Sequence, residues 1–206
     1  MTYDLSKENE RLAPGTAKKL VLASTSRYRA QLLARLSLTF EILDPGIDET
    51  PNANEDPRAL ALRLAIAKAQ TPLAPADAWV LGSDQVLACR ERTLGKPGTH
   101  DMAIQQLNAC SGSTVSFYTA VCLSNRASSL CYSHVVDTRV TFRELSDRDI
   151  ATYVATEPAL DCAGSFKVEG LGISLFTEVS STDPTALEGL PLISVCSMLR
   201  EANLMD

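Results

Sequence analysis

Two long apolar segments constrain the fold of this chain more than any other feature. Val115–Leu123 and Leu130–Phe142 are rich in β-branched and aromatic residues, and the short stretch Ser124–Ser129 separates them. This arrangement predicts the two antiparallel strands of one hairpin. The hairpin interrupts a series in which strand-like and helix-like segments alternate. Together these features indicate an α/β fold built on a mixed sheet.

The alternating segments are identified by apolar runs and by helix-capping residues. Further strands are predicted at Lys19–Ala23, Phe40–Leu43, Trp79–Leu81 with an extended continuation over Gln85–Cys89, and Ile173–Val179. Helices are predicted at Arg27–Leu36, from Asp56 to about Gln70, from Thr99 to Cys110, and at Asp147–Thr156 and Leu190–Ala202. Loops or irregular structure are expected at Pro45–Asn54, Arg90–Pro97 and Leu160–Gly172.

The length of the chain bounds its domain organisation. Its 206 residues contain no internal repeat, low-complexity tract or clear linker, so one domain or one two-lobed unit is expected. The polar residues before Lys19 predict a mobile tail over residues 1–18. Because 45% of the residues are hydrophobic, the chain can bury a sizeable core.

Composition argues against several classes of protein. The net charge is −6 and no basic stripe is visible, which disfavours a general nucleic-acid binder. No apolar run approaches the roughly 20 residues that span a bilayer, and the polar first residues do not resemble a secretory signal. The six cysteines are dispersed and there are two histidines, so a zinc site is not expected. We therefore expect a cytoplasmic protein with free thiols.

The first candidate site follows the first predicted strand. Ser24–Arg29 places hydroxyl groups at the start of a helix, where free backbone N–H groups and the helix dipole attract anions. The side chains of Ser24 and Arg29 can add hydrogen bonds and positive charge. An ordinary capped helix with solvated arginines explains the same residues, so this stretch alone leaves both interpretations open.

Acidic residues occupy two loops that follow predicted strands. Asp48 and Glu49 could hold Mg²⁺ or Mn²⁺, which prefer oxygen ligands, and an ordinary polar turn is the alternative. Asp84 follows an apolar strand and Gly82, a common place for a catalytic carboxylate in α/β proteins. Its alternative is a β-turn or bulge in which the aspartate makes local hydrogen bonds.

Two lysines and a glycine-containing segment complete the candidates. Gly95 and Pro97 flank Lys96 and would hold its side chain in place for a phosphate. Lys68 lies near the end of its predicted helix and fits a solvated face as well as a site. The segment Ala163–Gly170 contains glycines that permit close approach of the backbone to a ligand.

Seven short stretches together resemble the Maf family of nucleoside triphosphate pyrophosphatases. Between Leu20 and about Arg200 they occur in the order LVLASTSRYRAQLL, DPGIDETP, RLAIAKA, GSDQ, LGKP, CAGSFKVEGLG and LEGLPL. The resemblance implies an elongated, two-lobed, Maf/inosine-triphosphatase-like α/β fold over residues 19–206, with a mixed sheet flanked by helices. It also implies a homodimer, and hydrolysis between the α- and β-phosphates with a divalent cation such as Mg²⁺, Mn²⁺ or Co²⁺.

The resemblance assigns roles residue by residue. Asp84 is expected to be the catalytic acid–base group and, with Glu49, to hold the metal. The positions expected to hold the triphosphate are Ser24, Arg29, Lys68 and Lys96. These roles suit the chemistry, because cleavage of a phosphoric anhydride needs an activated water and neutralisation of charge on the leaving group.

Three further positions indicate the branch of the family. Tyr28, Gln85 and Glu169 resemble the aromatic, Gln and Glu of the branch that hydrolyses 7-methyl-GTP, whereas members with a pyrimidine preference carry Arg, Thr and Gln. Methylation at N7 makes guanine cationic, and an aromatic face gains about 0.5–2 kcal/mol from a stacked cation. Glu169 can accept hydrogen bonds from the N1 and N2 edge. Ala30 departs from the branch, which carries a second arginine there.

We therefore expect an enzyme that hydrolyses 7-methyl-GTP and so keeps a modified nucleotide out of nucleic acid. The alternatives are a dTTP/UTP or broader modified-nucleotide pyrophosphatase, and a nucleotide-binding regulator of cell division. The pair Asp84 and Glu49 favours an enzyme, because a pure binder does not need both carboxylates. The expected partner is a small-molecule nucleotide rather than a nucleic acid or a membrane.

Overall fold

The computed structural model describes residues 18–90, 92–157 and 159–206. The prediction of a mobile tail over residues 1–18 therefore lies outside the described residues, apart from Lys18. The Nζ atom of Lys18 donates to the carbonyl of Ala202 at 2.7 Å. Among the helices of these ranges, none combines the length and the apolar character needed to cross a membrane.

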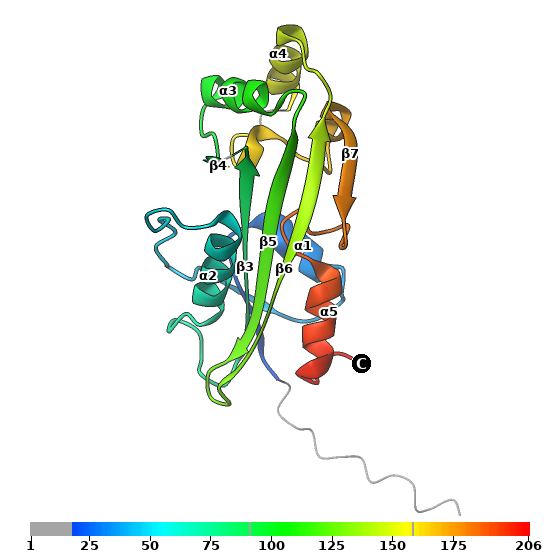
Figure 1. Ribbon diagram of the computed structural model, residues 1–206. Helices are drawn as coiled ribbons and strands as arrows, with labels where there is room; N and C mark the ends of the chain where they lie inside the picture. Colours follow the sequence, from blue (N-terminus) through cyan, green and yellow to red (C-terminus); the bar gives the residue numbers. More distant parts are fainter. Residues whose placement is uncertain (1–17, 91, 158) are drawn as a thin grey trace, which may run out of the picture.

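Within these ranges, seven strands form one mixed sheet in the order β2-β1-β3-β5-β6-β7, with β4 beside β3 (Figure 1). Strand β1 pairs in parallel with β2 and β3, and the other pairings are antiparallel. The predicted hairpin is the β5–β6 pair. The strands are β1 (Leu20–Ala23), β2 (Glu41–Leu43), β3 (Trp79–Cys89), β4 (Arg92–Leu94), β5 (Thr114–Asn125), β6 (Leu130–Phe142) and β7 (Phe176–Ser181). The prediction of an α/β fold with a mixed sheet is confirmed.

Helices cover both faces of this sheet. Ala120 and Cys122 of β5 pack against α2, whereas Val121 and Leu123 pack in a cluster with residues of α1 and α5. Opposite packing follows from the strand itself, because successive side chains point to opposite faces. The helices are α1 (Arg27–Ala34), α2 (Pro57–Ala69), α3 (His100–Cys110), α4 (Asp147–Thr156) and α5 (Leu192–Glu201).

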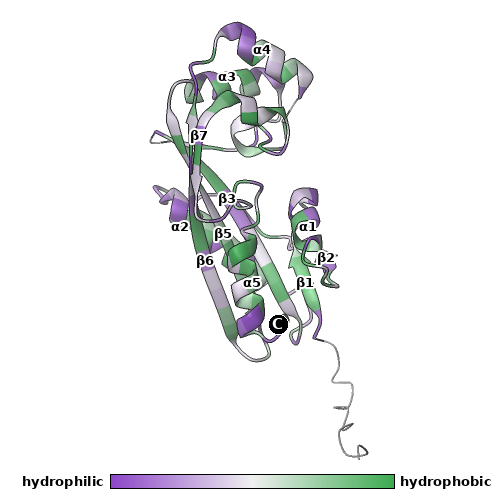
Figure 2. Cartoon of the chain, turned by 90° about the vertical axis from the view of Figure 1, so that its right-hand side faces the viewer, coloured by the Kyte–Doolittle hydropathy of each residue, from purple (hydrophilic) through white to green (hydrophobic). Residues whose placement is uncertain are grey.

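The molecule is elongated, with α3 and α4 at one end and α1, α2 and α5 around the rest of the sheet (Figure 2). The end that carries α3 and α4 has its own apolar cluster, which includes Leu107, Ile150 and three phenylalanines. Phe166 contacts Phe176 edge to face, with ring centroids 4.8 Å apart, a favourable aromatic geometry. Strand β5 contributes to the clusters of both ends, so a single sheet runs through the molecule. The division into one domain over residues 19–206 stays a prediction.

One edge of β3 is open in the middle of the sheet. Strand β1 ends where Ala23 pairs with Gly82, and β4 joins only where Leu94 pairs with Leu87. Between these points Ser83–Val86 have no strand partner on that edge among the described residues. At this gap, side chains from both faces of β3 reach the same cleft, and this cleft holds the candidate site.

Two sequence expectations need correction. The segment Arg90–Pro97, expected to be a polar turn, contains β4, because Arg90 adopts a left-handed turn with φ 56° and returns the chain along β3. The strand expected from Ile173 begins instead at Phe176. The preceding Leu171–Leu175 forms a 3₁₀ turn, where the Glu157 carboxylate accepts from the Leu171 N–H at 2.8 Å.

Candidate active site

The turn between β1 and α1 holds a serine–arginine pair. Ser26 is the N-cap of α1, and its hydroxyl accepts from the Arg29 N–H at 3.4 Å. The buried Ser24 hydroxyl accepts from the Ser26 N–H and from the Arg29 guanidinium, each at 3.2 Å. Helix capping therefore sets the backbone of this turn, and the hydrogen bond between Ser24 and Arg29 orients the two side chains that are expected to bind phosphate.

A second contact orients Arg29 from the opposite end of the chain. Its Nε atom donates to the carbonyl of Gly189 at 3.0 Å. Gly189 has φ 108°, a backbone conformation that favours glycine. Burial lowers the pKa of Arg29, and the charges of Asp84 and Glu49 oppose this effect. The guanidinium stays charged, since arginine is not deprotonated in proteins.

Lys68 brings the two predicted carboxylates together. Its Nζ atom lies 2.6 Å from Asp84 Oδ1 and 2.6 Å from Glu49 Oε1. The side chains of Lys68 and Asp84 are 5% and 10% exposed, whereas that of Glu49 is 59% exposed. Asp84 is thus shielded on β3, and Glu49 reaches the pair from a loop that is open to solvent.

The surroundings of Glu49 keep its carboxylate ionised. Burial raises the pKa of Glu49, but the hydrogen bond and charge of Lys68, helped by Lys96 and Arg29, outweigh burial and place the pKa below its ordinary value. The neighbouring Asp48 is turned to its own loop, where it accepts from the N–H and hydroxyl of Thr50. Of the two adjacent acids, Glu49 lines the cleft and Asp48 does not.

Gln85 faces away from Asp84, because adjacent residues of β3 point to opposite faces. Its Nε2 atom donates to the Thr119 hydroxyl at 3.0 Å and to the carbonyls of Ala186 and Leu187 at 3.0 and 3.2 Å. The nitrogen is therefore committed to holding the 183–190 segment. The Oε1 atom makes no hydrogen bond within the described residues and is the atom that a ligand can use.

Three buried polar residues that sequence analysis missed also support this segment. Ser83 donates to the Gly189 carbonyl at 3.0 Å, and Thr119 donates to the Ala186 carbonyl at 3.0 Å. The Asp183 carboxylate accepts from the Ile193 N–H at 2.7 Å. A sequence signal existed, because Ser83 and Thr119 are polar residues inside apolar strands, where buried polar groups need partners.

The wall of the cleft opposite Lys68 is formed by Tyr28. Its hydroxyl accepts from Arg27 at 2.8 Å and lies 3.5 Å from Asp161 Oδ2. The Arg27 guanidinium carbon sits 4.9 Å from the centroid of the tyrosine ring. The ring therefore already contacts one planar cation, a geometry that suits cation–π contact. Glu169 is exposed on the same cleft, and its side chain makes no hydrogen bond or ion pair within the described residues.

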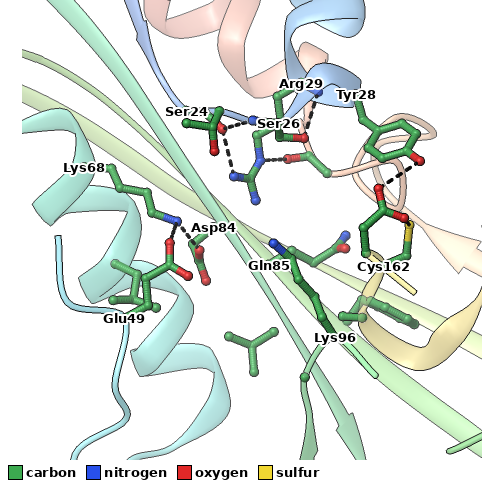
Figure 3. A pocket seen from close by; sticks show the side chains of 18 of the residues that line it. Ser24, Ser26, Tyr28, Arg29, Glu49, Lys68, Asp84, Gln85, Lys96 and Cys162 are labelled. Carbon is green, nitrogen blue, oxygen red and sulfur yellow. Dashed lines mark hydrogen bonds and ion pairs between the residues drawn. The ribbon is translucent and has the colours of Figure 1, made fainter. Parts of the chain in front are cut away.

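The nine side chains to which the family resemblance assigns roles line one cleft of about 850 Å³, and all of them except Glu169 are labelled in Figure 3. They are Ser24, Tyr28, Arg29, Glu49, Lys68, Asp84, Gln85, Lys96 and Glu169. In Figure 3 the Lys68 cluster lies on one side, Tyr28 on the other, and Gln85 and Lys96 between them. The structure thus brings the candidates together, while the role of each stays a prediction.

The carboxylate pair suits a hard divalent cation. Among the described residues no group of three or more His, Cys, Asp or Glu side chains surrounds one point. Glu49 and Asp84 nevertheless direct one oxygen each to the same cationic atom. Mg²⁺ commonly binds proteins through one or two carboxylates and takes its other ligands from phosphates and water. The donor set therefore fits a cation that is shared with a polyphosphate.

Comparisons with known proteins agree with the geometry. A family model described as Maf-like protein matches residues 19–202. The 7-methyl-GTP pyrophosphatase of Xanthomonas axonopodis pv. citri is 53% identical over 186 residues, 89% of this chain and 96% of the relative. The proteins of the same name from Cupriavidus pinatubonensis and Nitrosococcus oceani are each 50% identical over 89% of this chain, and over 93% and 92% of their own lengths.

Proposed function

We propose that this chain, which belongs to the Maf family, hydrolyses 7-methyl-GTP to 7-methyl-GMP and pyrophosphate. The observation that carries the proposal is the cleft itself, where two carboxylates and a set of cations face a tyrosine and a glutamate. Such an enzyme removes a modified nucleotide before it enters nucleic acid. The approximately 50% identical relatives of the same name support this function.

The cations of the cleft hold the triphosphate. Arg29 lies in the first turn of α1, whose N-terminus itself favours anions, and its Nη2 atom makes no hydrogen bond within the described residues. The exposed Lys96 and the buried Lys68 supply further charge from two other elements. Charge-assisted hydrogen bonds of this kind are stronger than neutral ones and fix the chain of phosphates in one direction.

The reaction transfers the α-phosphoryl group to water. The water oxygen forms a bond to the α-phosphorus, and the bond from this phosphorus to the α–β bridging oxygen breaks. The bridging oxygen keeps the electron pair and leaves as part of pyrophosphate. Asp84 accepts the proton of the attacking water, a role for which a carboxylate shielded from solvent is suited.

Glu49 and Asp84 would hold a divalent cation, Mg²⁺, Mn²⁺ or Co²⁺. When bound, such a cation offsets the negative charge that develops on the phosphates. Arg29 and Lys96 also offset this negative charge, so the protein itself contributes to stabilising the leaving pyrophosphate.

The base is selected at the far wall of the cleft. The ring of Tyr28 offers a face to the cationic 7-methylguanine, and the carboxylate of Glu169 accepts from the N1 and N2 edge. The free Oε1 of Gln85 adds an acceptor from β3. A neutral pyrimidine gains less from each of these groups.

A nucleotide panel tests the proposal. Purified protein with Mn²⁺ or Mg²⁺ is assayed for pyrophosphate release from 7-methyl-GTP, GTP, UTP and dTTP. We expect the highest kcat/KM for 7-methyl-GTP, and GTP is the matched control because it lacks only the methyl group and its charge. Faster cleavage of UTP or dTTP would overturn the choice of substrate.

We further propose that the enzyme is a cytoplasmic homodimer without stable nucleic-acid binding. The net charge of −6 disfavours contact with a nucleic-acid backbone. Light scattering after size-exclusion chromatography measures the mass, and a mass of one chain, 22.2 kDa, would contradict the dimer.

A further inference from the structure

Lys68 occupies the position at which the two acidic side chains converge. One ammonium nitrogen lies 2.6 Å from an oxygen of each carboxylate, and these carboxylates are the groups proposed to hold the divalent cation. A cation that used the same two oxygens would stand close to the ammonium group, where like charges repel strongly in a shielded site. The lysine and the metal therefore compete for one place.

We propose that Lys68 is an internal counter-ion, held by Asp84 and Glu49 in the nucleotide-free enzyme and exchanged for the divalent cation when the metal–nucleotide complex binds. This inference rests on the proposed function and adds to it an order in which the metal and the nucleotide bind. The metal alone binds weakly, and the metal with a polyphosphate binds well. Lys68 acts here as a positioning residue that keeps the two carboxylates close together until substrate arrives.

Burial explains why the exchange needs the nucleotide. The Lys68 side chain is 5% exposed, and a buried ammonium without a partner is costly. The lysine leaves the carboxylates only when another anion receives it. A phosphate can be that anion, because its oxygens accept hydrogen bonds and the ammonium group has three donors and no acceptor. The triphosphate thus takes Lys68 as the cation takes the carboxylates.

The same geometry sets the expectation for a neutral side chain at this position. Without the ammonium, two neighbouring carboxylates repel each other, and their side chains have no other hydrogen-bond partner in the part of the chain that the structure describes. A divalent cation relieves the repulsion, so its affinity rises even without nucleotide. If Lys68 instead stayed between the carboxylates and used its third donor for phosphate, removing it would not tighten metal binding.

The test is a titration of the full chain with Mn²⁺ alone, followed by the electron paramagnetic resonance signal of free hydrated Mn²⁺. We expect Lys68→Met to bind Mn²⁺ at least about tenfold more tightly than the unchanged protein, a difference of about 1.4 kcal/mol. Lys96→Met is the matched control. It removes the same charge from the same cleft, but Lys96 makes no ion pair with either carboxylate among the described residues, so a change below about threefold is expected.

Thermal unfolding gives a second measurement on the same proteins. Mn²⁺ should raise the melting temperature of Lys68→Met more than that of the unchanged protein. If Lys68→Met does not fold, Lys68→Gln serves, because its neutral amide can still donate to one carboxylate. Equal or weaker Mn²⁺ affinity in the folded neutral variant would overturn the inference.

The titration is independent of catalysis. It contains no nucleotide and measures no turnover, so failure of the nucleotide panel would overturn the proposed function and leave the exchange intact. Conversely, the nucleotide panel could support the proposed function while the neutral variants of Lys68 bind Mn²⁺ no better than the unchanged protein. That result would overturn the exchange alone.

Discussion

At the scale of single residues, two neighbours on β3 serve different sides of the site. Asp84 points to α2 and meets Lys68, while Gln85 points to the 183–190 segment and holds its carbonyls. Strand geometry requires this divergence. Both side chains still line the cleft, because the edge of β3 is open at these residues.

Asp84→Asn isolates the proposed proton acceptor. The amide keeps the size of the side chain but cannot take a proton, so we expect kcat for 7-methyl-GTP to fall by about 10²–10⁴-fold. Nucleotide affinity measured by calorimetry should be largely retained, because Arg29 and Lys96 are untouched. Asp48→Asn is the control, since Asp48 bonds Thr50 and lies outside the cleft. Full turnover by Asp84→Asn would show that Asp84 is not the proton acceptor.

Tyr28 and Glu169 are expected to choose the base. The double change Tyr28→Arg with Glu169→Gln removes the aromatic face and the negative charge that favour a cationic base. We expect the ratio of kcat/KM for 7-methyl-GTP to that for UTP to fall by at least about tenfold. Each single variant serves as a control for the other. An unchanged ratio would show that other residues choose the base.

At the scale of elements, the approach of α2 to β3 depends on Gly82. A Cβ atom at this position would lie 2.4 Å from the Ala65 carbonyl oxygen and 2.5 Å from the Ala69 nitrogen. Neither backbone atom can move without shifting the helix. The close approach is what places Lys68 of α2 against Asp84 of β3.

Gly82→Ala should therefore separate α2 from the sheet. We expect a loss of about 1–3 kcal/mol in the free energy of unfolding, as for overpacking in a dense core. Gly95→Ala is the control, because nothing lies within 4 Å of a Cβ there, and a change within about 0.5 kcal/mol is expected. Chemical denaturation measures both variants. Equal stability of the two would contradict the proposed contact.

The loop that carries Glu49 is fixed to α2 by an ion pair. Arg63 donates to both oxygens of Glu55 at 2.7 and 2.8 Å, and to the Thr50 carbonyl at 3.1 Å. The hydrogen bond from Arg63, followed by one from the Asn52 N–H, lowers the pKa of Glu55 from 4.5 to about 2. The depressed pKa means that the pair stabilises the fold above pH 4.5 and loses this effect as the pH falls toward 2.

Glu55→Gln should accordingly matter near neutral pH and much less in acid. We expect the variant to melt at a lower temperature than the unchanged protein at neutral pH, and the difference to shrink as the pH falls toward about 3. Melting curves at a series of pH values measure it. A difference that does not change with pH would show that the ion pair contributes no pH-dependent stability.

At the scale of the whole molecule, the site joins segments from nearly the full length of the chain. The serine–arginine turn follows β1, Lys68 comes from α2, and Glu169 follows the 3₁₀ turn Ala163–Ser165. The sheet connects these parts, because β3 and β5 run past both ends of the cleft. Arg29 illustrates the distance covered, since its partner Gly189 lies 160 residues away in the sequence.

Much of this arrangement could be predicted from local signals. Capping residues were among the signals for the predicted helix starts, and in the structure the side chains of Ser26, Asp56, Thr99 and Ser146 each accept a hydrogen bond from the backbone of the helix that follows. Helix capping and strand periodicity involve residues that are close together in the chain, so they can be recognised in the sequence without knowledge of the tertiary contacts. Short or polar elements were harder to predict. Strand β4 depends on pairing with β3, and in the 3₁₀ turn before β7 the Leu171 N–H donates to the distant Glu157 carboxylate.

Patterns within the sequence predicted the α/β class and most of the elements, and the family resemblance pointed to nine of the residues that line the cleft. The sequence did not determine how those residues meet. Packing between distant segments places Lys68 between two carboxylates and commits the nitrogen of Gln85 to the 183–190 segment. Asp48 instead bonds Thr50 within its own loop. The positions of Lys68 and Gln85 depend on strand pairing and helix approach between distant segments, where the position of a side chain is set by partners that no local pattern identifies.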